Sequence, residues 1–313
     1  MKVKIIKGGN KNMIRLLLKL YPINEQVKPY ETPFGHIFQA VIFGWLHENC
    51  PQLTHKLHAY GEIRPYAINC HIHKKKPFVE FKIVSYNDVL SSVLIETIIP
   101  IEGKILTVAE KKYRVQNLKI ERINLKKLIK TSKPVRNFHI HFPTPIHFST
   151  SRGNYPVRFP LPSIFFGNLT SLYNDIIRKT ALIERQNFLN WINTHCYVSG
   201  YEMKSAEYFI KTNQKVVGGQ GSLSYRIKKP NESFYNQNDI LEDLSGSHIN
   251  SKNKQARIKA HYRENCRWID LLCRLGEYTN VGRNRSAGMG VIRYFPKKYL
   301  EKEPALKVLS SIT

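Results

Sequence analysis

The chain has 313 residues, and its 49 lysines and arginines against 23 aspartates and glutamates give a formal net charge of +26 at pH 7. Charge of one sign in this excess repels itself in a folded protein, so a polyanionic partner is the simplest explanation, nucleic acid before an anionic membrane surface. No apolar run approaches the roughly 20 residues that cross a bilayer. Arg15 and Lys19 interrupt the apolar segment 13–21, which argues against a signal peptide. The five cysteines form no C-x-x-C pair and fit reduced thiols of a cytoplasmic protein.

The first half of the chain alternates predicted strands and helices. Residues 14–22 are typical of a strand, and the apolar residues of 34–46 recur at helical spacing. A second short helix is expected from Pro51 to about His58. The elements expected next are strands at 66–71 and 78–86, a helix from an Asn87 N-cap to 98, and strands at 104–108 and 113–123. This βαββαβ order predicts a ferredoxin-like, RRM-like domain.

The second half repeats this order more loosely after a basic segment, residues 126–136. We expect a strand at 138–148, a long helix at 163–192, strands at 195–203, 207–211 and 220–227, a polar insertion at about 229–253, a basic helix at 255–275 and a closing strand at 291–295. The predicted fold class is therefore α+β, with two tandem ferredoxin-like domains built on antiparallel sheets. The predicted domains are 1–132, with the candidate catalytic histidine, and 133–313, with the glycine-rich loop.

Two glycine-containing segments suggest contact with a phosphate group. Residues 280–290 read NVGRNRSAGMG, and residues 217–225, ahead of a predicted strand, read VGGQGSLSY. Glycines allow positive φ and bring backbone N–H groups close to an anion. Arg283 and Arg285 add planar donors that suit phosphate oxygens. The alternative is a glycine-rich hairpin whose arginines are only solvated.

Together with the repeated βαββαβ order, these segments resemble one family. It is the Cas6 family of CRISPR-associated endoribonucleases, which mature precursor CRISPR RNA and belong to the RAMP superfamily of tandem ferredoxin-like proteins. Gly282, Gly288 and Gly290 stand in register with the family's G-x-G-x5-G-x-G loop. Asn280 replaces the leading glycine, and asparagine tolerates the left-handed conformation better than most residues. Residues 38–68 resemble the family's region around the catalytic histidine.

The resemblance implies a catalytic site in this region. His58 matches the catalytic histidine, and Arg64 stands where many members have a lysine, six residues later. Some members have a tyrosine fifteen residues before the histidine, but this chain has Phe43, which has no proton to transfer, so a Tyr–His–Lys triad is incomplete. Tyr60 and Tyr66 are alternative proton donors. The simpler interpretation of His58 is a helix-terminal histidine that the helix dipole favours.

A wider set of residues is expected to contact RNA. Phe43 and His47 fall on the polar face of the predicted helix, with His36 as a further candidate, and Phe43 there would stack on a base or meet the second domain. The basic segments 74–76, 126–136 and 252–267 are candidates for phosphate contacts. The predicted RNA-binding residues are Gly282, Arg283, Arg285, Ser286, Gly288, Gly290, Phe43, His47, Gly219 and Gly221.

Two His-x-His pairs, His71/His73 and His139/His141, each place two imidazoles on one side of a predicted strand. This geometry can chelate zinc, but neither cysteine nor carboxylate stands at ligand spacing. We therefore expect neither a metal ion nor another cofactor.

The resemblance implies a metal-independent endoribonuclease that cleaves precursor CRISPR RNA within its repeats. Attack by the ribose 2′-OH on its own phosphate would leave a 2′,3′-cyclic phosphate and a 5′-OH. One alternative is a catalytically weak or inactive RAMP-type protein that holds CRISPR RNA without cutting it, and another is a general RRM-like RNA-binding protein. The expected partners are repeat RNA and other CRISPR effector subunits, with the protein a cytoplasmic monomer or homodimer away from membranes.

Overall fold

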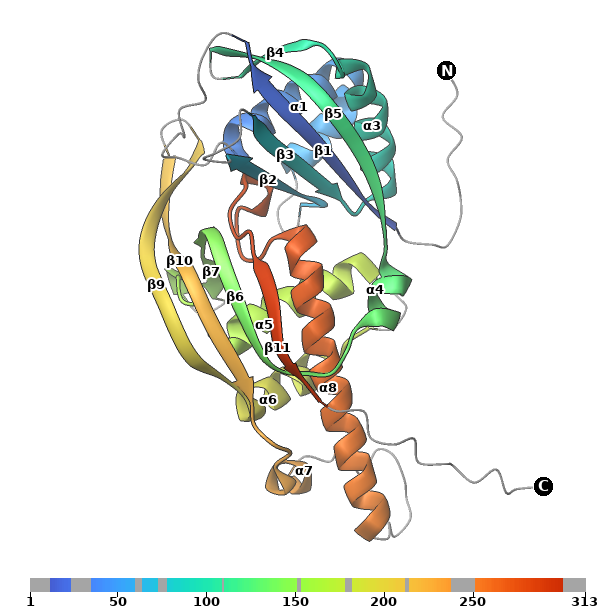
Figure 1. The fold of residues 1–313 in the computed structure, drawn as a ribbon, viewed down its shortest axis with the longest axis vertical. Helices are drawn as coiled ribbons and strands as arrows, with labels where there is room; N and C mark the ends of the chain where they lie inside the picture. The colour runs from blue at the N-terminus through green and yellow to red at the C-terminus, as the bar shows by residue number, and fades with distance from the viewer. Residues whose placement is uncertain are drawn as a thin grey trace, which may run out of the picture.

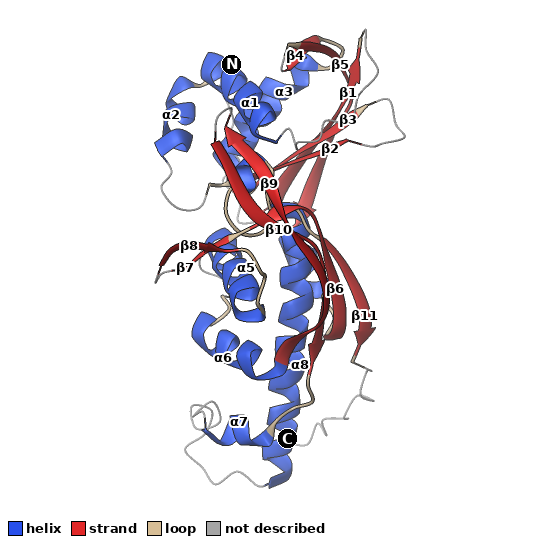
Figure 2. Ribbon diagram, turned by 90° about the vertical axis from the view of Figure 1, so that its left-hand side faces the viewer, coloured by secondary structure: helices blue, strands red, loops and turns tan. Residues whose placement is uncertain are grey.

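The computed structural model describes residues 12–23, 35–59, 64–72, 78–108, 110–150, 153–177, 182–211, 214–237 and 251–300. These residues form two α+β units stacked end to end, each with a sheet covered by helices on one face (Figures 1 and 2). Among them, no helix is both long and apolar enough to cross a bilayer.

The N-terminal unit is built on an antiparallel sheet with the strand order β2-β3-β1-β5-β4. Its strands are β1 (Asn12–Pro22), β2 (Tyr66–Ile72), β3 (Val79–Ser85), β4 (Ile105–Val108) and β5 (Lys111–Asn124). The helices α1 (Gly35–Asn49), α2 (Pro51–Ala59) and α3 (Asp88–Ile98) lie on one side of the sheet, and the short 3-10 helix η1 (Ile99–Ile101) follows α3 (Figure 2). Leu16, Leu18 and Leu20 alternate along β1 and are buried in the core beneath these helices.

The C-terminal unit has an antiparallel sheet with the order β11-β6-β10-β9. Its strands are β6 (Val135–Ile146), β9 (Cys196–Lys211), β10 (Gln214–Ile227) and β11 (Arg293–Tyr299), and a small hairpin joins β7 (Phe148–Thr150) to β8 (Gly153–Val157). The helices are α4 (Leu125–Thr131), α5 (Pro162–Ile177), α6 (Arg185–His195), α7 (Glu232–Gln237) and α8 (Ser251–Thr279), and a 3-10 turn, η3 (Arg285–Ala287), precedes β11. Without the short β4, the strands of both sheets follow one order, in which the first strand lies between the third and the fourth. The prediction of two tandem ferredoxin-like folds is confirmed.

α3 begins where the sequence predicts. Asn87 has an extended backbone, and its side chain accepts a hydrogen bond of 3.0 Å from the Leu90 N–H, as an N-cap does. Leu90, Leu94 and Ile98 then recur on one face of the helix and are buried against the sheet.

The helical region predicted over 163–192 consists of two helices, α5 and α6. The side chain of Asn174 in α5 bonds both the N–H and the C=O of Ile183, at 3.0 and 2.8 Å, and so holds the segment just before α6 against α5. Glu184 then caps a new helix by accepting hydrogen bonds from the N–H groups of Gln186 and Asn187. A polar side chain that satisfies the backbone locally therefore ends the helical run.

Other expectations differ in detail. The strands predicted at 195–203 and 207–211 are one strand, β9, because residues 204–206 continue its pairing with β10. The basic segment after β5 contains α4, which Asn124 caps and whose Leu125 and Leu128 are buried in the C-terminal core. The expected polar insertion includes α7, and residues 238–250 lie outside the described residues. The boundary at 132/133 stays a prediction.

We expect Asn87→Ala to lower the free energy of unfolding by about 1 kcal/mol, because the Leu90 N–H loses its acceptor. Urea denaturation measures the change. Asn87→Ser keeps a capping oxygen and serves as the control; an equal loss in both variants would mean that the cap is not the cause.

Candidate functional site

The glycine loop, residues 280–290, lies between the two units, after the end of α8 (Figure 1). Asn280, Gly282, Asn284, Gly288 and Gly290 all have positive φ, between 54° and 93°. A Cβ at position 290 would lie 1.7 Å from the Val281 carbonyl oxygen, and one at position 282 would lie 2.5 Å from that of His147. The motif glycines are therefore required by close backbone packing as well as by φ.

The amides of this loop are used within the protein. The Val281 N–H bonds Gly290 O at 2.8 Å, the Gly282 N–H bonds Asn168 Oδ1 at 2.8 Å, and the Arg283 N–H bonds His147 O at 2.9 Å. The N–H groups of residues 287–291 are likewise donated to protein oxygens. The expectation that the glycines turn the loop amides toward an anion is therefore wrong for residues 281–283 and 287–291.

Side chains connect the loop to the N-terminal unit. Asn280 Nδ2 donates to Ile68 O in β2 at 2.7 Å, and Arg64 Nη1 donates to Ser286 Oγ at 3.1 Å. The hydroxyl of Tyr208 in β9 donates to Ala287 O at 2.8 Å. The loop is thus bonded to the sheets of both units.

The two arginines of the loop have different surroundings. Arg283 is exposed, whereas only 8 % of Arg285 is exposed. Arg285 Nη1 donates to the Tyr86 hydroxyl at 3.0 Å and to Thr279 O at 3.2 Å. Burial raises the pKa of Tyr86, and the Arg285 charge opposes this shift. Arg285 was expected to face phosphate, but the structure gives it an internal role between the units.

Of the two predicted catalytic residues, Arg64 has described contacts. It is half-buried just before β2 and is joined to Ser286 of the glycine loop. His58 lies in the last turn of α2, but its side chain, like Tyr60, lies outside what the structure describes. The hydroxyl of Tyr66 is buried and accepts a hydrogen bond of 2.9 Å from Gln39. Burial raises the pKa of Tyr66, and the charge of Arg64 opposes this shift. The raised pKa makes this phenol a weak proton donor.

The expectation for Phe43 is wrong. Its ring is 8 % exposed, belongs to the N-terminal core and packs edge-on against Tyr66 at 6.1 Å between centroids. The apolar face of α1 is broader than its spacing indicates, so Phe43 is not free to stack on a base. His47 is exposed in the last turn of α1, as expected. His36 is half-buried beside the backbone of Phe209 in β9, and burial lowers its pKa.

Gly219 and Gly221 in β10 are packing positions. A Cβ at Gly219 would lie 2.3 Å from the carbonyl oxygen of Arg158, and one at Gly221 would lie 2.1 Å from that of Glu202. These glycines let β10 approach β9 and the chain at residue 158, and their role in RNA binding stays a prediction.

Beside the loop lies a basic group that the sequence did not indicate. Only 5 % of His147 is exposed, and its Nε2 lies 3.4 Å from Asn284 Nδ2. Burial lowers the pKa of His147, and the charges of Arg283 and Arg158 lower it further. Position 283 is far from positions 147 and 158 in the chain, and no spacing signal connects the three. We name Arg158, Arg283 and His147 the basic cluster.

The His-x-His pairs have other partners. His139 Nδ1 lies 3.1 Å from Ser224 Oγ, and His141 Nδ1 lies 2.9 Å from Ser222 Oγ. His73 falls outside the described residues. Within the described ranges, no three histidine, cysteine, aspartate or glutamate side chains gather closely enough to hold a metal ion.

The two loop arginines are expected to contribute unequally to the free energy of unfolding. Arg285→Ala is expected to lower the free energy of unfolding by about 2 kcal/mol, because it removes a charged donor from a buried hydroxyl and a carbonyl. Arg283→Ala, two residues away and exposed, is the matched control and should stay within about 0.5 kcal/mol of the parent protein. Chemical denaturation compares them, and equal stabilities would contradict an internal role for Arg285.

Comparison with known proteins supports one family. Residues 140–292 match the family model of the CRISPR-associated endoribonuclease Cas6. The CRISPR-associated endoribonuclease Cas6 of Streptococcus thermophilus is 23 % identical over 190 residues, which are 60 % of this chain and 63 % of that protein. The matched part is thus less than two thirds of this curated relative.

Solved structures share the fold over nearly the whole chain. A Cas6 product complex is 16 % identical, with a TM-score of 0.65 over 90 % of this chain and 99 % of that one. Thermus thermophilus Cas6 is 14 % identical, with a TM-score of 0.62 over 92 % of this chain and 100 % of that one. The sequence match and the shared fold together confirm the resemblance of this chain to the Cas6 family of CRISPR-associated endoribonucleases.

Proposed function

We propose that this protein is a metal-independent endoribonuclease that cleaves precursor CRISPR RNA within its repeats. The observation that carries the proposal is the hydrogen bond between Arg64 and Ser286, 222 residues apart in the chain. It joins the glycine loop to the segment that begins six residues after His58. The Arg64 cation is therefore held beside the loop, where we expect it to meet a bound phosphate.

The chemistry requires few protein groups, because the RNA carries its own nucleophile. The 2′-oxygen attacks the adjacent phosphorus, the bond from phosphorus to the 5′-oxygen breaks, and a 2′,3′-cyclic phosphate and a 5′-OH result. His58 takes the proton of the 2′-OH or gives one to the leaving 5′-oxygen, a role that suits a group titrating near neutral pH. Arg64 stabilises the charge that develops on the phosphoryl oxygens.

RNA binding outside the cleavage site is assigned to the exposed members of the basic cluster. Arg283 and Arg158 face solvent, unlike Arg285, so they are free to contact phosphates. Solved Cas6 structures of the same fold include a product complex and a substrate mimic complex. We expect repeat RNA to bind on the same side of this protein as the glycine loop. We expect the protein to act in the cytoplasm.

A second candidate function is that of a RAMP-type protein that holds CRISPR RNA without cutting it. Two features favour it. Phe43 is buried and has no hydroxyl that could transfer a proton, and the hydroxyl of the nearby Tyr66 accepts a hydrogen bond from Gln39. Under this alternative the wild-type protein binds repeat RNA tightly and leaves it intact.

We expect His58→Ala to slow cleavage of labelled repeat RNA by roughly 10²- to 10⁴-fold in EDTA, because assisted proton transfer is lost. Affinity for the RNA should change little, since binding depends on phosphate contacts. His55→Ala, which removes an exposed histidine three residues earlier in the same helix, is the matched control. Cleavage by His58→Ala at the wild-type rate would exclude the catalytic role, and intact RNA with both proteins would favour the second candidate.

A substrate with a single 2′-deoxy nucleotide at the cleavage site should bind normally and resist cleavage, because its nucleophile is absent. Denaturing gel electrophoresis measures the product, and the all-ribose RNA is the control. Normal cleavage of the deoxy substrate would exclude the internal-nucleophile mechanism.

A further inference from the structure

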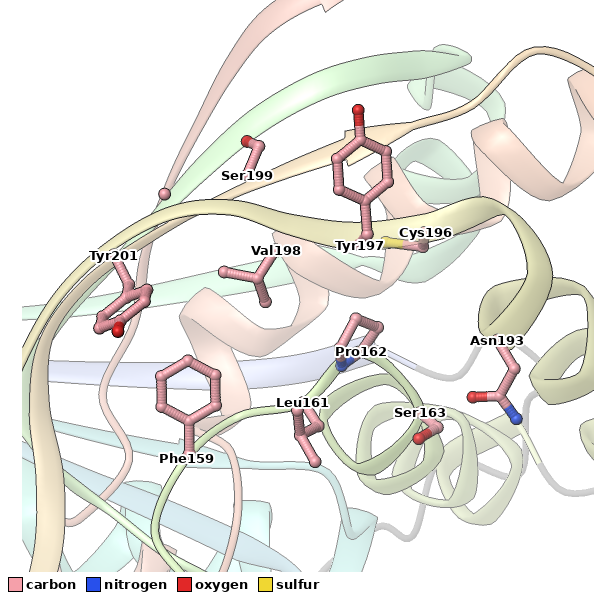
Figure 3. Close-up of a pocket in the computed structure, with 11 residues that line it drawn as sticks. Phe159, Leu161, Pro162, Ser163, Asn193, Cys196, Tyr197, Val198, Ser199 and Tyr201 are labelled. Atoms are coloured by element: carbon pink, nitrogen blue, oxygen red, sulfur yellow. The ribbon is translucent and has the colours of Figure 1, made fainter.

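A groove of about 590 Å³ opens between the first half of β9 and the segment that leads into α5 (Figure 3). β9 is an edge strand of the C-terminal sheet, bonded to β10 on one side. Tyr201 and Val198 project from β9 toward Phe159, Leu161 and Pro162, whereas Tyr197 and Ser199 point away on the other side of the strand.

The groove is neutral and has an exposed aromatic wall. None of its eleven lining residues is a lysine, arginine, aspartate, glutamate or histidine, in a chain of net charge +26. Tyr201 is 70 % exposed, and its ring meets that of Phe159 edge-on at 5.5 Å between centroids. A flat, uncharged ring system is the type of group that stacks on such a surface.

One end of the groove is next to the basic cluster. Arg158 immediately precedes Phe159, is exposed, and has its carbonyl oxygen against Gly219. Gly218, next to Gly219 in β10, lies against Ile146, and the following residue, His147, accepts a hydrogen bond from the Arg283 N–H. Arg158 therefore lies near the glycine loop as well as next to the groove. A nucleic-acid strand that extends from the glycine loop toward the groove would therefore pass the two arginines, which suit its phosphates. It would then reach the neutral aromatic surface, which suits its bases.

We infer that single-stranded RNA leaving the glycine loop runs past Arg283 and Arg158 and stacks a base on Tyr201 in this groove. The inference rests on the proposed function only in taking RNA as the ligand. A second copy of this chain, added along the free edge of β9, is disfavoured because each copy carries a charge of +26. Phosphate contacts position the strand, and stacking adds affinity that depends little on sequence.

The test separates base stacking from phosphate contact. The probes are a fluorescently labelled ten-nucleotide oligoadenylate and an abasic ribose-phosphate strand of the same length, with affinities from fluorescence anisotropy. Tyr201→Ala should weaken oligoadenylate binding by about 5-fold or more and leave abasic binding unchanged. Arg158→Ala should weaken both, because it removes a phosphate contact.

Two control variants guard the interpretation. Tyr201→Phe keeps the ring and should bind oligoadenylate as the parent does. Phe295→Ala removes a ring that is 49 % exposed on β11, the opposite edge strand, and should have no effect. Equal oligoadenylate affinity for Tyr201→Ala and the parent, or an equal loss on both probes, would overturn the inference.

Other results distinguish the alternatives. If Tyr201→Ala converted a dimer to a monomer in light scattering and left oligoadenylate affinity unchanged, the groove would be a contact between copies and the inference would be wrong. Cleavage of repeat RNA is measured separately. If the protein fails to cleave repeat RNA but Tyr201→Ala weakens oligoadenylate binding, the proposed function is contradicted and the inference about the groove is supported. If the protein cleaves but Tyr201→Ala binds oligoadenylate as the parent does, the proposed function is supported and the inference about the groove is contradicted.

Discussion

The arrangement of the two units depends on how closely the backbone of the glycine loop approaches its neighbours. A Cβ at Gly35, at the start of α1, would lie 2.1 Å from Ala287 O, and one at Gly288 would lie 2.5 Å from the Tyr208 hydroxyl. No side chain larger than hydrogen fits at either contact. With this approach made, the side chains of Asn280 and Ser286 reach bonding partners in and beside β2. Glycine in this protein therefore serves the junction of the two units as well as the site.

The same constraint divides the basic residues by function. A charged side chain at the junction has to be satisfied internally, and Arg285 donates to a buried hydroxyl and a carbonyl. Arg283, two residues earlier, is exposed, so its charge can interact with an external ligand. The basic residues of the chain thus differ in function: a buried one bonds internal oxygens, and an exposed one can bind an external ligand. Burial, more than spacing in the sequence, distinguishes the two kinds.

Local signals in the sequence predicted local structure well. The Asn87 cap, the paired strands β2 and β3 before it and the helices before β2 could be predicted from neighbouring residues alone. The glycine motif predicted where the loop lies, but the reason for the glycines is steric, because the amides expected to meet an anion bond the protein. The start of α6 depends on the side chains of Asn174 and Glu184, whose bonds to the backbone are not visible in the hydrophobic periodicity.

What the sequence could not predict depends on contacts between distant residues. Phe43 is buried because α1 is covered on more than one face, and Arg285 because a second unit lies against it. His147 and Arg158 join Arg283 only through the packing of β6, β10 and the loop. Such contacts have no signature at fixed spacing, so the basic cluster and the neutral groove became visible only in three dimensions.

The hydrogen bonds between the two units can form only late in translation, after both of their partners have been synthesised. Ile68 accepts a hydrogen bond from a residue that the ribosome adds 212 residues later, and Arg64 donates one to a residue added 222 residues later. The N-terminal sheet, complete by residue 124, can form long before then, and the C-terminal sheet lacks only its edge strand β11 at that stage. Folding during translation would therefore produce a complete N-terminal unit and a C-terminal unit without β11, connected through α4, and the bonds made by residues 280–290 would then fix the two units together.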